Sequence, residues 1–122
     1  MQCIEKIRIV KRYLNALGIR VIDTDEHSEY DSEEHMIYLS NAYESKCHRL
    51  YALLHEAGHA HEALDREHLP DGYYYHPCPH ERLREEERRC WDYGWTIGER
   101  LRLDLDKEDY FVYANECLKC YE

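Results

Sequence analysis

Residues 50–60 read LYALLHEAGHA and combine an apolar helical face with the motif H-E-x-x-H. His55 and His59 are four residues apart, so an α-helix places both imidazoles on one face, where they can bind a common metal ion. Neutral imidazole nitrogens are typical ligands of Zn²⁺. Glu56 is turned away from that position, but it can contact a metal-bound water molecule as a general base. The stretch therefore predicts a helix that carries a zinc site.

A catalytic zinc site needs a third protein ligand, with the fourth position left for water. The sequence after position 80 predicts a helix whose apolar face comprises Leu83, Cys90, Gly94, Ile97 and Leu101. Glu87 fills the gap in this pattern, so it is expected on the buried face, where binding a metal compensates the cost of burying a carboxylate. Glu85 aligns with charged positions and is expected in solvent, whereas Glu86 is intermediate and is the alternative ligand.

The rest of the chain predicts an α+β fold in one domain, residues 1–122. The expected helices are 3–17, 45–64, 80–101 and one that starts at Asp106, and the expected strands are 19–23, 27–30 and 35–39. Gly18 ends the first helix, and the last helix is expected to bury Phe111, Ala114, Leu118 and Tyr121. A turn is expected at 70–72, and two prolines exclude regular helix from 73–79.

These motifs resemble those of the gluzincin metallopeptidases and are most similar to the small ImmA/IrrE-like zinc peptidases. That family carries H-E-x-x-H on one helix and a glutamate on a later helix in the context E-x-x-A-x-x-x-A, where this sequence has Glu87, Cys90 and Gly94. The resemblance covers about residues 19–101 and does not include the helix-turn-helix or sensor domain of the regulatory members. It implies a zincin-like fold, in which a small antiparallel sheet of about three strands packs against the H-E-x-x-H helix, a glutamate-ligand helix and terminal helices. It also implies that an edge strand binds extended substrate.

Motif and resemblance together predict a zinc-dependent peptidase with one Zn²⁺ per chain. His55, His59 and Glu87 would bind the metal, and Glu56 would take the proton of the attacking water and pass it to the leaving amine. The expected partner is a peptide or protein substrate, and the negative charge favours a basic or extended segment. Two alternatives stay open: a non-enzymatic interaction protein that keeps a zincin fold stabilised by zinc, and a metal-free helical binding module.

Composition excludes several classes of protein. The net charge of −10 repels phosphate backbones and disfavours a nucleic-acid binder. The sequence contains no apolar run long enough for a membrane helix, and its first residues do not form a signal peptide. We therefore expect the six cysteines to be reduced thiols and the protein to be cytoplasmic, with its oligomeric state left open.

Several other polar side chains are candidates for secondary roles. Cys117 and Cys120 form a C-x-x-C pair that is expected to pack in the core, and His61 is expected to be solvated on the face away from the metal. An oxyanion donor is expected among the residues of 72–80, His48 and Tyr51. The same loop offers further metal-binding candidates, of which the cysteine could also occupy the open position on zinc: His76, Cys78 and His80.

Overall fold

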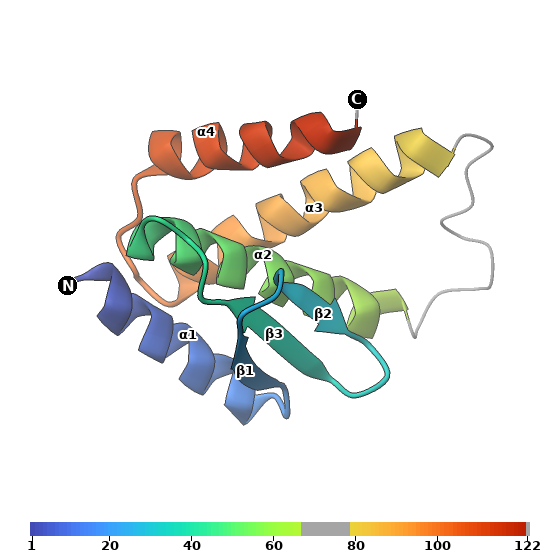
Figure 1. Cartoon of the computed structure of the whole chain (residues 1–122). Helices are drawn as coiled ribbons and strands as arrows, with labels where there is room; N and C mark the ends of the chain where they lie inside the picture. The colour runs from blue at the N-terminus through green and yellow to red at the C-terminus, as the bar shows by residue number, and fades with distance from the viewer. Residues whose placement is uncertain (67–78, 122) are drawn as a thin grey trace.

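The computed structural model describes residues 1–66 and 79–121, and this part of the chain has an α+β architecture (Figure 1). The elements are α1 Cys3–Ala16, β1 Arg20–Thr24, β2 Glu29–Asp31, β3 Met36–Ser40, α2 Lys46–Arg66, α3 Pro79–Arg100, α4 Lys107–Leu118 and the short 3₁₀ helix η1 Lys119–Tyr121. Their succession agrees with the predicted α-β-β-β-α-α-α order. The turn expected at 70–72 and the irregular stretch that follows it, up to position 78, lie outside the described residues.

The three strands form a mixed sheet with the order β1-β3-β2. β2 and β3 form the predicted antiparallel hairpin, in which Tyr30 lies opposite Ile37. β1 pairs parallel to β3, with Val21 beside Ile37, so the expectation of an antiparallel sheet is wrong for this pair. β1 and β2 run in opposite directions and are not neighbours in the sheet. β3 lies between them and runs in the same direction as β1. Its central place explains why Ile37 and Leu39 are fully buried.

α2 lies between the sheet on one side and α3 and α4 on the other, and α1 lies beside it (Figure 1). Its apolar side chains belong to the same core as those of the sheet and the other helices, and Leu50, Leu53 and Leu54 are fully buried. Ser45 caps the start of the helix, because its Oγ accepts the backbone N–H groups of the next turn. The H-E-x-x-H motif therefore stands on a helix that neighbours hold on several sides.

Two glycines let α2 and α3 approach at backbone distance. A Cβ at Gly58 would overlap the backbone carbonyl of Cys90, and a Cβ at Gly94 would lie 2.6 Å from the carbonyl oxygen of Leu54. Both positions require a glycine, since real Cβ atoms do not come this close to a backbone oxygen. A glycine inside a helix costs about 1 kcal/mol relative to alanine, and this packing explains why Gly58 is present in the H-E-x-x-H helix. The close contact brings the faces that carry His59 and Glu87 together.

The buried face of α3 follows the prediction in its middle and departs from it at its start. Cys90 and Ile97 are 1% exposed, whereas Leu83 is 39% exposed. The periodicity of a helix identifies one face, but it does not say how far along that face the neighbouring elements extend. Leu83 lies in the first turns of α3 and outside the core cluster, so the expectation that it is buried is wrong.

α4 starts as expected but turns a different aromatic residue inward. The side chain of Asp106 accepts the backbone N–H of Asp109 and caps the helix. Tyr110 is fully buried and donates its hydroxyl to the backbone carbonyl of Trp91 at 2.6 Å, whereas Phe111 is only half-buried. Ala114 and Leu118 are buried as predicted, and the side chain of residue 121 lies outside the described part.

A disulfide joins Cys3 at the start of α1 to Cys47 in the first turn of α2. The prediction that all six cysteines are reduced thiols is therefore wrong for this pair. The packing of α1 on α2 brings the two residues together from distant parts of the sequence, so their spacing carried no signal. The cytoplasmic location stays a prediction, and reduced cysteines no longer argue for it. Among the described helices, none is both long and apolar enough to cross a bilayer.

Candidate metal centre

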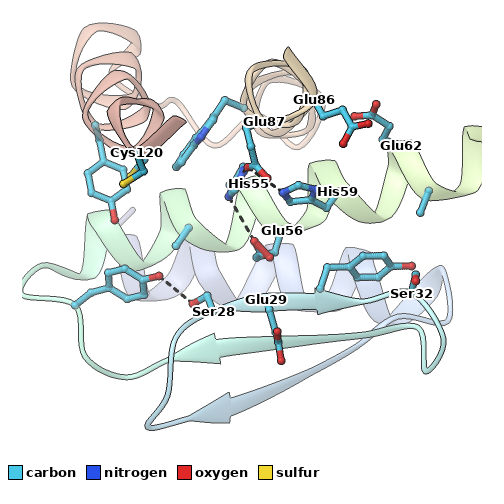
Figure 2. A pocket seen from close by; sticks show the side chains of 17 residues that line it. Ser28, Glu29, Ser32, His55, Glu56, His59, Glu62, Glu86, Glu87 and Cys120 are labelled. Carbon is cyan, nitrogen blue, oxygen red and sulfur yellow. Dashed lines mark hydrogen bonds and ion pairs between the residues drawn. The ribbon is translucent and has the colours of Figure 1, made fainter. Parts of the chain in front are cut away.

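Three side chains from two helices converge between α2 and α3, namely His55 and His59 of α2 and Glu87 of α3 (Figure 2). Their potential ligand atoms all lie within 4.8 Å of one another. Glu87 Oε2 is 2.6 Å from His55 Nε2 and 3.1 Å from His59 Nε2, so one carboxylate oxygen faces both imidazoles. The structure thus brings together the three residues that the sequence singled out, and this His-His-Glu group can hold a metal ion.

The neighbours of Glu87 lie as the analysis of helix faces predicted. Glu85 is exposed, and Glu86 is half-buried and lines the same cavity as the His-His-Glu group, which is called the metal-binding group because it can hold an ion. Figure 2 shows the carboxylate of Glu87 pointing toward the two histidines, whereas Glu86 lies to the side, near Glu62. Glu87 is therefore the member of the three consecutive glutamates whose side chain reaches both imidazoles.

The charges of the group support one another. Burial alone would raise the pKa of Glu87, but the hydrogen bonds from His55 and His59 lower it to about 2. Burial alone would lower the pKa of His59, but its hydrogen bond to Glu87 and the nearby charge of Glu56 raise it above its ordinary value. At neutral pH the group therefore presents an ionised carboxylate, as a cation ligand must be.

Buried side chains fix the orientation of each imidazole. The ring of His55 stacks on Trp91, with ring centroids 4.3 Å apart and an angle of 10° between the planes. His59 Nδ1 lies 3.2 Å from the sulfur of Cys90. Burial and the neighbouring Glu62 carboxylate raise the pKa of Cys90, so its side chain is a neutral thiol. Both Nε2 atoms consequently point toward Glu87, and neither ring has to reorient to bind a metal.

Glu56 is a buried carboxylate with an unsatisfied oxygen. The residue is 5% exposed, and its Oε2 has no hydrogen-bond partner among the described residues. Oε1 lies 3.4 Å from His55 Nδ1, and Figure 2 shows the carboxylate between α2 and β2, beside the metal-binding group. Burial raises the pKa of Glu56. An unpaired buried carboxylate oxygen is costly, so its presence here indicates a place for a water molecule or a polar ligand.

A cavity of about 510 Å³ opens onto the group and onto Glu56. β2, an outer strand of the sheet, lies along one side of it, and α3 and the end of α4 lie along the other (Figure 2). The lining side chains outside the His-His-Glu group include Ser28, Glu29, Tyr30, Tyr43, Glu62, Glu86, Trp91, Tyr113, Cys117 and Cys120. The cavity therefore connects the two histidines and Glu56 with an outer strand of the sheet.

Three residues of the last helical segment line this cavity, and sequence reasoning assigned none of them there. Tyr113, Cys117 and Cys120 follow one another at intervals of about one helical turn, so they share a face. Cys117 packs against the core from the cavity side, but Cys120 is exposed, so the core-packing prediction is wrong for Cys120. The helical spacing of these three residues was a usable signal, but it did not indicate which element they face.

The expected oxyanion donors on α2 are engaged elsewhere. Tyr51 donates its hydroxyl to Asp109 at 2.6 Å, and the ring of His48 stacks on Tyr113 at 4.5 Å. Neither Tyr51 nor His48 lines the cavity, whereas Tyr113 does, and so does Tyr43, whose hydroxyl lies 2.9 Å from Ser28 Oγ. The remaining donor and metal-ligand candidates of residues 72–78 lie outside the described residues, as does the side chain of His80.

His61 faces away from the metal-binding group, as predicted, but it is half-buried and not fully solvated. Its ring stacks on Tyr13 and on Tyr93, and its Nε2 lies 2.8 Å from the hydroxyl of Tyr13. The packing of α1 and α3 on either side of α2 supplies these partners, which the local sequence of α2 does not reveal.

No protein-family model matches the chain, and neither a curated protein nor a solved structure matches it. The function is therefore argued from the geometry of the site.

Proposed function

We propose that this chain is a zinc-dependent peptidase with a zincin-like fold and a gluzincin type of site. The observation that carries the proposal is the Oε2 of the buried Glu56, which lacks a hydrogen-bond partner in the described part of the chain and lies next to a His-His-Glu group. Two histidines and one glutamate, with a position left open, are a donor set found in catalytic zinc sites. Among the described residues, the group that can hold a metal consists of these three side chains.

Each residue of the site has a distinct role in the proposed hydrolysis. Zn²⁺, when bound, lowers the pKa of a coordinated water molecule and polarises the scissile carbonyl. Glu56 accepts the proton of the attacking water and delivers it to the leaving amine. Its buried position supports this role, because burial raises the pKa of Glu56 above that of a solvated glutamate and so makes it a stronger base. Trp91 holds His55 in place by stacking.

The cavity supports an extended peptide as substrate. β2 is an outer strand that lines the cavity, so a peptide can pair with it as an additional strand. Glu29 lies along the same cavity, and its negative charge favours basic side chains in the substrate. The net charge of −10 acts in the same direction at longer range.

Metal content and one isosteric variant test the proposal. Purified protein should contain about one zinc ion per chain, and the double variant His55→Ala with His59→Ala should contain none. Glu56→Gln should keep the zinc but lose hydrolysis of fluorogenic peptides, because an amide cannot accept the water proton. Glu85→Gln, which changes an exposed glutamate on α3, is the matched control and should cleave like the parent.

The outcomes separate the alternatives. Full zinc retention in the double histidine variant would eliminate the site, and undiminished cleavage by Glu56→Gln would eliminate the mechanism. Zinc binding by a parent protein that cleaves no peptide would support the interaction protein stabilised by zinc. Absence of zinc after re-metallation would support the metal-free binding module.

A further inference from the structure

Cys90 lies at the contact between α2 and α3 and touches groups on both of its sides. It is 1% exposed, and its sulfur lies 3.2 Å from His59 Nδ1 and 3.3 Å from Glu62 Oε2. Glu62, on α2, is 5% exposed, and its other oxygen accepts Arg89 Nε at 3.0 Å and Arg89 Nη2 at 2.8 Å. Arg89, Glu62, Cys90 and His59 therefore form a continuous polar chain that ends on the metal-binding group.

The number of hydrogens available determines which atom donates and which accepts in each of these hydrogen bonds. An ionised carboxylate can only accept, so the contact between Cys90 and Glu62 is a hydrogen bond only if the thiol donates its single hydrogen to Oε2. The sulfur then has no hydrogen left for His59, and the second contact is a hydrogen bond only if His59 Nδ1 carries a proton and donates it to the sulfur. Without a metal ion, Nε2 donates its own proton to Glu87. A metal ion that replaces this proton meets the Nε2 lone pair, while Nδ1 keeps its hydrogen on the sulfur.

We propose that Cys90 is a positioning residue for the metal site: its thiol, anchored by Glu62 and Arg89, holds His59 as the Nδ1–H tautomer with Nε2 available to a metal ion. The hydrogen-bonded series Arg89, Glu62, Cys90 and His59 is the Cys90 relay. The tautomer that the relay selects is the one that metal binding through Nε2 requires. Metal-bound histidines commonly donate their second ring nitrogen to a carboxylate or carbonyl, and here a thiol takes that place and passes the contact on to a buried carboxylate.

This inference rests on the proposed zinc site, and two variants of one position test it. Cys90→Ala removes the thiol and one heavy atom, whereas Cys90→Ser keeps one donor and one acceptor at the same position. Removing a partner of a metal-bound histidine weakens metal affinity about 10- to 100-fold. We expect Cys90→Ala to weaken zinc binding about 10-fold or more, measured by competition with a chromophoric chelator. Cys90→Ser should restore most of the affinity.

Ile97→Val controls for a small loss of packing on the buried face of α3. Ile97 is also 1% exposed and does not touch the metal-binding group, so this variant should bind zinc like the parent. Equal zinc affinity in Cys90→Ala and the parent would overturn the proposal, and so would an equal loss in Cys90→Ser and Cys90→Ala. A parent protein that does not bind zinc would instead overturn the proposed function, so the two failures are distinguishable.

A second measurement uses the unmodified protein and does not depend on the folding of a variant. In the zinc-loaded parent labelled with ¹⁵N, the Nδ1–H proton of His59 should give a resonance that exchanges slowly with water, because it is hydrogen-bonded to the buried sulfur of Cys90. Rapid exchange of this proton in the parent would contradict the relay. In folded Cys90→Ala the resonance should broaden or disappear, whereas a purely structural role of Cys90 would leave it unchanged.

Discussion

Replacing Glu87 by glutamine tests the His-His-Glu group with the smallest possible change of shape. Oε2 of Glu87 faces His55 Nε2 at 2.6 Å and His59 Nε2 at 3.1 Å. A glutamine places either a neutral carbonyl oxygen or an amide nitrogen at this point, and neither replaces an anionic ligand of a divalent cation. The variant should therefore fold and bind zinc weakly.

The expected size of the effect follows from ligand linkage. Free zinc at 100 times its dissociation constant stabilises the native state by about 2.7 kcal/mol. A domain of this length shifts its melting temperature by about 3–5 °C per kcal/mol, so removing zinc from the parent should lower the midpoint by about 10 °C. Loss of one of three protein ligands should weaken binding by about 100-fold or more, which reduces the chelator-dependent shift at the same zinc concentration to about 2 °C or less.

The assay is thermal unfolding monitored by circular dichroism, with and without a chelator. It compares the parent with Glu85→Gln, Glu86→Gln and Glu87→Gln. Comparing each variant with itself removes any change in intrinsic stability, such as the loss of the hydrogen bonds that Glu87 makes without metal. Glu85 is exposed, so its variant should show the full shift of the parent. Glu86→Gln should also keep it.

Two results would refute the reasoning. A full shift in Glu87→Gln together with no shift in Glu86→Gln would move the ligand by one residue and invalidate the assignment of faces on α3. A full shift in both variants would place the third ligand elsewhere, with His76, Cys78 and His80 as the next candidates.

Three further predictions concern protonation, packing and the disulfide. Zinc affinity measured by isothermal titration should fall as the pH is lowered, and the fall should already begin above 6.5, because the raised pKa of His59 makes protons compete for its Nε2. Gly58→Ala should lower stability by about 1–3 kcal/mol in urea unfolding and weaken zinc binding, since its Cβ meets rigid backbone. In Gly98→Ala the Cβ meets only the end of a leucine side chain, so an equal loss there would contradict the reasoning. Reduction of the Cys3–Cys47 bond, which spans 44 residues, should destabilise the fold by about 4 kcal/mol, and an unchanged melting temperature would exclude this pairing.

The site was predictable from the sequence because it depends on local periodicity. The spacing of His55 and His59 fixes their common face on any α-helix, and the apolar pattern around Glu87 distinguishes it from its two neighbours. The same logic located the cap at Asp106 and the end of α1 at Gly18, whose φ of 83° lies in the left-handed region. Each of these features depends on residues within one or two helical turns of one another in the sequence.

Features that depend on the packing of distant elements were missed. The parallel pairing of β1 with β3 is decided by the strand that fills the space beside β1, which the strand sequences do not encode. Aromatic partners from α1 and α3 cover part of the His61 ring, although its neighbours in sequence gave no sign of them. The bond between Cys3 and Cys47 likewise needs the docking of α1 on α2.

The two glycine contacts between α2 and α3 also determine which changes in chain length the site can tolerate. Gly58 meets the backbone of Cys90, and Gly94 meets that of Leu54, so the helices touch at two points, one turn apart on each. A one-residue insertion between the two points on either helix would move one point by about 1.5 Å and rotate it by about 100°, which forces a side chain into the opposing backbone. Additions before α2 or after α3 leave this alignment unchanged. The backbone contacts at Gly58 and Gly94 thus determine the spacing of the side chains that face each other across α2 and α3. Other ligand residues could be introduced at these positions without changing how the two helices pack.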